Sequence, residues 1–204
     1  MAWLDTANAA MWELVHRYTG KVGYKLGAKA GSLNHDPAVI DCSGWTALLL
    51  SDAMKAANNV QAIFSEADLA AVHTNSERMI ENLERRSGLI LEGDQIEINA
   101  LPRYATIGLQ QGGGTWAANT SRPRGITHIV QVVRRPTDGL PFVSEAAGMF
   151  RPPGVRLLSL IDWLEQTESY LRRGTAWAVD PFRFGSAPLT KVSVGKERSP
   201  SRAA

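Results

Sequence analysis

The chain has 204 residues, of which 44% are hydrophobic and 21% charged, a balance typical of a soluble globular protein with one core. The formal net charge of +2 is too small to indicate nucleic-acid binding. No apolar run reaches the length of a membrane span, so the sequence predicts no membrane insertion. The first residues lack a basic start followed by an apolar stretch, so we expect synthesis in the cytoplasm without a Sec signal peptide.

Helical patterns dominate the first half of the chain. Apolar residues at helical spacing predict a helix over 4–18, and a loop rich in Gly, Asn, Asp and Pro follows over 20–41. The tetrapeptide Asp-Cys-Ser-Gly at 41–44 then opens an apolar helix. A further helix is expected over 66–86, because the segment starts with a capping-box pattern and keeps helical spacing.

Short strand patterns fill the second half. The segments with β-branched residues or alternation are 89–93, 95–99, 105–110, 126–135, 140–148 and 175–184, with one amphipathic segment between them at 157–172. Helices first and strands second indicate the α+β class. We expect a single domain over 1–185 and a flexible polar tail over 186–204.

The lone cysteine, Cys42, is a candidate nucleophile. A single Cys excludes an internal disulfide, and a buried small hydrophobe is the plain alternative for it. Its place at the start of a helix favours the thiolate, because unpaired N–H groups and the helix dipole stabilise an anion there. The small residues Ser43 and Gly44 leave room for a substrate, and the backbone N–H of Cys42 can help to hold an oxyanion.

A cysteine nucleophile needs a base, and the chain offers four histidines. His128 lies in the strand pattern ITHIVQVV, where it either faces a site or is a core histidine bonded to a backbone carbonyl. His16 fits a solvated helix surface, His35 lies in turn-like sequence, and His73 lies between helical stretches. His128 is therefore the favoured base.

Together these pieces resemble the NlpC-type peptidoglycan peptidases. Tyr24 and Gly27 precede Asp41-Cys42-Ser43-Gly44-Trp45, the strand pattern His128-Ile129-Val130-Gln131-Val132 follows, and Phe142 to Gly148 takes the place of the family's third polar group. The resemblance covers about residues 20–148. It implies a papain-like fold in which a central helix that bears the cysteine packs on an antiparallel sheet. The chain departs from the family pattern at Thr127, where Gly is usual, and in the extra helix around 66–86.

The resemblance implies the catalytic roles. Cys42 attacks a peptide carbonyl, His128 takes and returns the proton, and Glu145 orients the imidazole, with Ser144 as the alternative third residue. Tyr24 adds a hydroxyl near the oxyanion. No metal and no cofactor is implied, and the chain shows no zinc-type spacing.

Two further features are expected at the substrate. Ser43 and Trp116 are candidate substrate contacts, while Trp45 is better explained by core packing. The glycines at 112–114 form no phosphate loop, because no Lys-Ser/Thr follows them, and they indicate a flap near the cleft or a plain long loop.

The expected activity is that of an amidase or endopeptidase on peptidoglycan stem peptides. Such an enzyme would be delivered to the periplasm or cell wall of a target cell, as an antibacterial type VI effector with a possible immunity protein, or as a phage lytic enzyme. Two alternatives stay open: a Cys-His toxin that deamidates or cleaves a host protein or transfers an acyl group, and a binding module in which Cys42 is inert.

Overall fold

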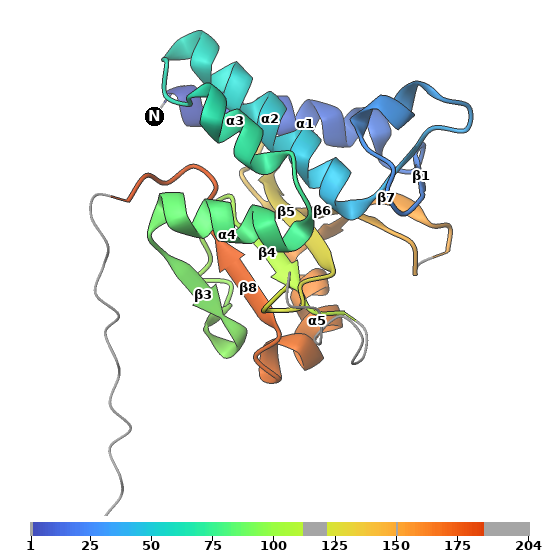
Figure 1. Cartoon of the computed structure of the whole chain (residues 1–204), viewed down its shortest axis with the longest axis vertical. Helices are drawn as coiled ribbons and strands as arrows, with labels where there is room; N and C mark the ends of the chain where they lie inside the picture. The colour runs from blue at the N-terminus through green and yellow to red at the C-terminus, as the bar shows by residue number, and fades with distance from the viewer. Residues whose placement is uncertain (1, 112–121, 150, 186–204) are drawn as a thin grey trace, which may run out of the picture.

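The computed structural model describes residues 2–111, 122–149 and 151–185, so the expected tail, the glycines at 112–114 and Trp116 lie outside the described residues. Within these ranges the chain forms five α-helices and a mainly antiparallel set of strands (Figure 1). The helices are α1 (Ala2–Tyr18), α2 (Cys42–Val60), α3 (Glu66–Val72), α4 (Ser76–Ser87) and α5 (Leu160–Arg172). None of these helices is both long and apolar enough to cross a membrane.

The main sheet has six strands in the order β3-β8-β4-β5-β6-β7, and all neighbouring pairs are antiparallel. They are β3 (Ile90–Glu92), β4 (Thr106–Leu109), β5 (His128–Arg134), β6 (Pro141–Ala147), β7 (Gly154–Ser159) and β8 (Ala176–Val179). A small parallel pair, β1 (Gly23–Tyr24) with β2 (Val39–Ile40), precedes α2. This combination of helices with an antiparallel sheet is compatible with the α+β class that the sequence predicts.

Helices cover both faces of the sheet. Because side chains alternate along a strand, Ile129 and Val133 of β5 pack into a core with α1, α2 and α4, while Val130 and Val132 pack into a second core with α5. Trp45 of α2 is fully buried in the first core, as its apolar ring predicts. The helix that begins at Cys42 therefore packs against both α1 and the strands β5 and β6.

The prediction of a single helix over 66–86 is wrong, because the helix is interrupted between Val72 and Ser76. Ser65 caps α3 in a capping box with Asp68, as predicted. The side chain of Asn75 then accepts a hydrogen bond from the N–H of Arg78 at 3.0 Å and starts α4 as a separate helix. The first turn of α4 therefore lies against the segment before β5, where Ser76 donates a hydrogen bond to the carbonyl of Ile126.

The alternating segment 95–99 is not a strand. Gly93, the first residue after β3, has φ +54°, a left-handed conformation that turns the chain. A short 3₁₀ helix begins at this glycine and covers Gly93–Gln95. The amphipathic segment at 157–172 is split as well. Its first residues belong to β7, and only the part from Leu160 is helical.

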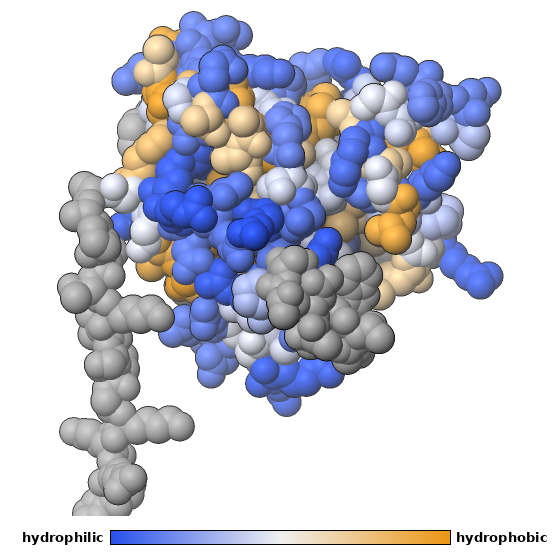
Figure 2. All heavy atoms as spheres, in the orientation of Figure 1, coloured by the Kyte–Doolittle hydropathy of each residue, from blue (hydrophilic) through white to orange (hydrophobic). Residues whose placement is uncertain are grey.

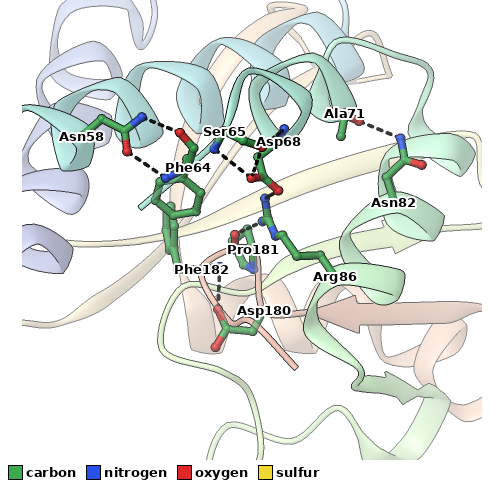
Figure 3. A network of polar contacts seen from close by, with 10 residues as sticks. All are labelled: Asn58, Phe64, Ser65, Asp68, Ala71, Asn82, Arg86, Asp180, Pro181 and Phe182. Carbon is green, nitrogen blue, oxygen red and sulfur yellow. Dashed lines mark hydrogen bonds and ion pairs between the residues drawn. The ribbon is translucent and has the colours of Figure 1, made fainter. Parts of the chain in front are cut away.

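The C-terminal end of α4 is tied to two other segments through Arg86 (Figure 3). Its guanidinium donates to Asp68 of α3 at 3.3 Å and to the carbonyl of Pro181, which follows β8. The same guanidinium lies 5.5 Å from the ring centroid of Phe64 and 5.4 Å from that of Phe184. These contacts fix the C-terminal end of α4.

Candidate active site

Cys42 is the first residue of α2, as the sequence predicts. The side chain of Asp41 caps this helix and accepts from the N–H of Gly44 at 2.6 Å. As the first helical residue, Cys42 has a backbone N–H without an intrahelical partner. Its Sγ lies 3.8 Å from the carbonyl oxygen of Thr127, and the residue keeps 6% of its surface exposed. The sulfur therefore faces the entry of β5.

His128 is the first residue of β5 and is buried, whereas His16, His35 and His73 are exposed. Its Nε2 lies 2.5 Å from Oε2 of Glu145 on β6. The side chain of Cys42 lies close enough to the imidazole to help raise the pKa of His128. Because Nε2 is engaged by Glu145, Nδ1 is the ring nitrogen left for the thiol.

The register of the sheet explains how Glu145 reaches His128. Gln131 pairs with Ser144 across β5 and β6, so His128 and Glu145 are diagonal neighbours on one face. Ser144 points to the other face, where its hydroxyl accepts from Nε1 of Trp45 at 2.9 Å. The structure thus brings Glu145, and not Ser144, to the imidazole.

The buried charges at this point favour a protonated imidazole. Burial alone would lower the pKa of His128, but the hydrogen bonds and charges of Cys42 and Glu145 outweigh burial and raise this pKa to about 9. Burial would likewise raise the pKa of Glu145, but His128 and then Arg156 outweigh it and hold this pKa below its usual value. The imidazole of His128 therefore favours its cationic form, and the carboxylate of Glu145 lies beside it.

Arg156 is a site residue that sequence reasoning missed. It lies on β7 directly opposite Glu145, and its Nε donates to Oε1 of Glu145 at 2.7 Å. Its Nη2 forms an ion pair with the same oxygen. Glu145 therefore uses one oxygen for His128 and the other for Arg156, so both position and charge of the carboxylate are fixed. Only recognition of β7 as the neighbour of β6 could have found this pairing.

Tyr24 lies beside the cysteine, in β1. It pairs with Ile40, two residues before Cys42, and its ring lies against Gly148, where an added Cβ would come within 2.7 Å of Tyr24 Cδ1. Burial, followed by the charges of Cys42 and Asp41, raises the pKa of Tyr24 to about 12. The phenol therefore stays protonated at neutral pH and can donate a hydrogen bond near the sulfur.

Ser43, expected at the substrate, has its hydroxyl turned toward the loop before α2. This hydroxyl accepts from Nζ of Lys29 at 2.6 Å and donates to Oδ1 of Asp41 at 3.1 Å. Asp41 also accepts from Lys29 and from the N–H of Gly27. These contacts brace the loop against the first turn of α2.

A small pocket adjoins this brace. Its volume is about 140 Å³, and it is lined by Lys29, Ala30, Ser43, Gly44, Ala47, His73 and Thr74. Gly44 is required here, because a Cβ on it would lie 2.8 Å from the carbonyl oxygen of Ala28. The Gly of the Asp-Cys-Ser-Gly tetrapeptide thus lets the loop approach the first turn of α2.

The described residues offer no group of three or more His, Cys, Asp and Glu side chains that could hold a metal ion. No protein-family model, no curated protein and no solved structure matches the chain.

Proposed function

We propose that the chain is a papain-like cysteine hydrolase that cleaves peptide bonds of bacterial peptidoglycan. The observation that carries the proposal is the convergence of Cys42, His128 and Glu145, which are far apart in sequence and come from α2, β5 and β6. A thiol at a helix start, an imidazole held by a carboxylate and a nearby donor are the groups that acyl transfer requires.

The reaction would proceed through an acyl-enzyme. The thiolate of Cys42 adds to the peptide carbonyl, and the backbone N–H of Cys42 and the hydroxyl of Tyr24 stabilise the oxyanion. The C–N bond breaks as the His128 imidazolium gives its proton to the leaving amine. Water, deprotonated by the now neutral imidazole, then attacks the thioester and releases the carboxylic acid and the thiol. Glu145 stabilises the imidazolium before the first proton transfer and again after the second.

The substrate class rests on the resemblance to NlpC-type peptidases. The tetrapeptide at 41–44, the tyrosine before it and the His strand after it are the pieces of that resemblance that the site brings together. A peptidoglycan stem peptide is therefore the proposed substrate. Delivery into the periplasm of a rival cell as a type VI effector, with an immunity protein in the producer, or use as a phage lytic enzyme are the settings proposed for it.

The direct test is digestion of purified sacculi with the full chain, analysed by mass spectrometry. Wild-type protein is expected to release new peptide products, and Cys42→Ala none. Sacculi that remain intact under wild-type protein would overturn the peptidoglycan proposal.

A second measurement addresses the thiol itself. Because Cys42 keeps only 6% of its surface exposed, its reaction with iodoacetamide reports both access and ionisation. A Cys42–His128 ion pair predicts alkylation that remains fast below pH 7. Alkylation that is slow there and rises only at alkaline pH would favour an inert cysteine.

A further inference from the structure

The segment that leads into β5 is fixed by hydrogen bonds at every backbone N–H from 124 to 127. The N–H groups of Gly125 and Thr127 donate to the carbonyls of Arg122 and Leu109 at 2.9 and 3.0 Å. Those of Arg124 and Ile126 donate to the side chain of Glu77. This segment matters because it carries Thr127 O, which faces Cys42 Sγ, and is followed at once by His128.

Glu77 is a fully buried carboxylate in the first turn of α4. Its Oε1 accepts from the N–H of Arg124 at 3.0 Å, and its Oε2 accepts from the N–H of Ile126 at 2.8 Å. The neighbouring Ser76 donates to the carbonyl of Ile126 at 2.8 Å. Withdrawing a carboxylate from water is costly unless its oxygens are hydrogen-bonded. Here both oxygens accept hydrogen bonds from the same short segment.

The helix that carries Glu77 is held at its other end as well. Arg86 binds α3 and the segment after β8, as Figure 3 shows. Met79, Ile80 and Leu83 of α4 are buried in the first core, while the outer side of the helix is polar (Figure 2). A helix fixed at both ends and along its inner side is a rigid support for whatever its first turn binds.

We propose that Glu77 is a positioning residue for the Cys42–His128 pair. By holding the N–H groups of Arg124 and Ile126, it sets where the chain enters β5 and therefore where the imidazole lies relative to the sulfur. This assigns a purpose to the α3–α4 segment, which departs from the NlpC pattern: it supports the active-site strand from outside the sheet. The inference rests on the proposed Cys42–His128 chemistry and on nothing about the substrate.

The test is the pH profile of Cys42 alkylation by iodoacetamide in the full chain. Glu77→Gln keeps the size of the side chain but replaces one acceptor oxygen by an NH₂ group, which would face a backbone N–H. We expect the rate below pH 7 to fall at least about tenfold and the profile to approach that of His128→Ala, because small displacements of catalytic groups are expensive. Glu81→Gln, on the same helix and paired with Arg78, is the matched control and should leave the profile unchanged.

A purely structural role makes a different prediction. It would lower the melting temperature of Glu77→Gln and leave the profile of the folded protein as in wild type, and this result would overturn the proposal. Glu77→Asp keeps both acceptors on a side chain shorter by one methylene, so it provides the same readout, with an intermediate profile expected, if Glu77→Gln does not fold. A wild-type profile identical to that of His128→Ala would overturn the catalytic pair and the role of Glu77 together, whereas a distinct wild-type profile that Glu77 variants do not change would overturn only the role of Glu77.

Discussion

At the scale of single residues, Glu145 is, after Cys42, a group that raises the pKa of His128. Substituting Glu145→Gln removes the anion that helps to keep the imidazole protonated, so the pKa of His128 should fall from about 9. We expect kcat/KM for hydrolysis to fall about 10- to 100-fold at neutral pH, and its alkaline limb to move to lower pH. The measurement is the pH dependence of kcat/KM on a soluble stem-peptide substrate.

Ser144→Ala is the control for this substitution, because it changes the adjacent residue on β6 but only removes the partner of Trp45. It should cost stability and leave the pH profile as in wild type. An alkaline limb that stays at the wild-type pH in Glu145→Gln would show that the carboxylate does not hold the imidazolium.

Tyr24 offers a second test at the residue scale. Tyr24→Phe removes only the hydroxyl, which burial and nearby charges keep protonated. If that hydroxyl stabilises the oxyanion, kcat should fall by about a hundredfold, since a single lost oxyanion donor has an effect of this order. Alkylation of Cys42 forms no oxyanion, so its rate should not change. Equal losses in both assays would indicate that Tyr24 merely packs against the cysteine.

At the scale of elements, the loop before α2 can pack against the first turn of that helix only because residue 44 is a glycine. In Gly44→Ala the new Cβ would lie 2.8 Å from the carbonyl oxygen of Ala28, so loop and helix must move apart. We expect a loss of about 1–3 kcal/mol in unfolding free energy and of a few degrees in melting temperature. Gly31→Ala, where the Cβ would meet no atom within 4 Å, is the control for thermal denaturation. Equal melting temperatures for the two variants would contradict this account.

The elements that sequence reasoning predicted are those whose signals are local. The helix after Asp41 has a capping side chain and an apolar face, and β5 has a run of β-branched residues, so both could be identified. The break before α4 depends on Asn75 capping a new helix within an otherwise helical pattern, and the turn after β3 on the left-handed Gly93. A single residue ends or starts the element in each case, and the periodic pattern of the residues around it gives no sign of the interruption.

The candidate site divides in the same way. Cys42 and His128 could be selected from their local sequence contexts. Glu145 could be selected because its position matches that of the third polar group in the family that the sequence resembles. Arg156 could not, because its role depends on the pairing of β6 with β7, a long-range contact without a local signal. Glu77 was hidden for a related reason: its partners lie at 124 and 126, and in sequence it is one of several charged residues on a helix.

At the scale of the whole molecule, the charged groups of the site couple folding to pH. The pKa of His128 is raised from its usual 6.5 to about 9, so its charged contacts contribute fully to stability below about pH 6.5 and are lost as the pH rises through about 9. The pKa of Glu145 is lowered from its usual 4.5, so its contribution is present above that value and is lost as the pH falls through the lower, folded-state value. Both contributions are therefore complete between about pH 4.5 and 6.5.

The resulting prediction compares thermal unfolding of wild type with that of His128→Gln across pH. His128→Gln keeps a polar side chain but cannot take a proton, so the difference in melting temperature should be largest between about pH 4.5 and 6.5 and should shrink above about pH 9. His16→Gln, an exposed histidine on α1, should follow wild type at every pH. A difference that stays constant from pH 5 to pH 10 would mean that folding leaves the pKa of His128 unchanged, and a difference that shrinks below about pH 6.5 would mean that the buried imidazole stays neutral. Either result would remove the basis of the thiolate–imidazolium pair.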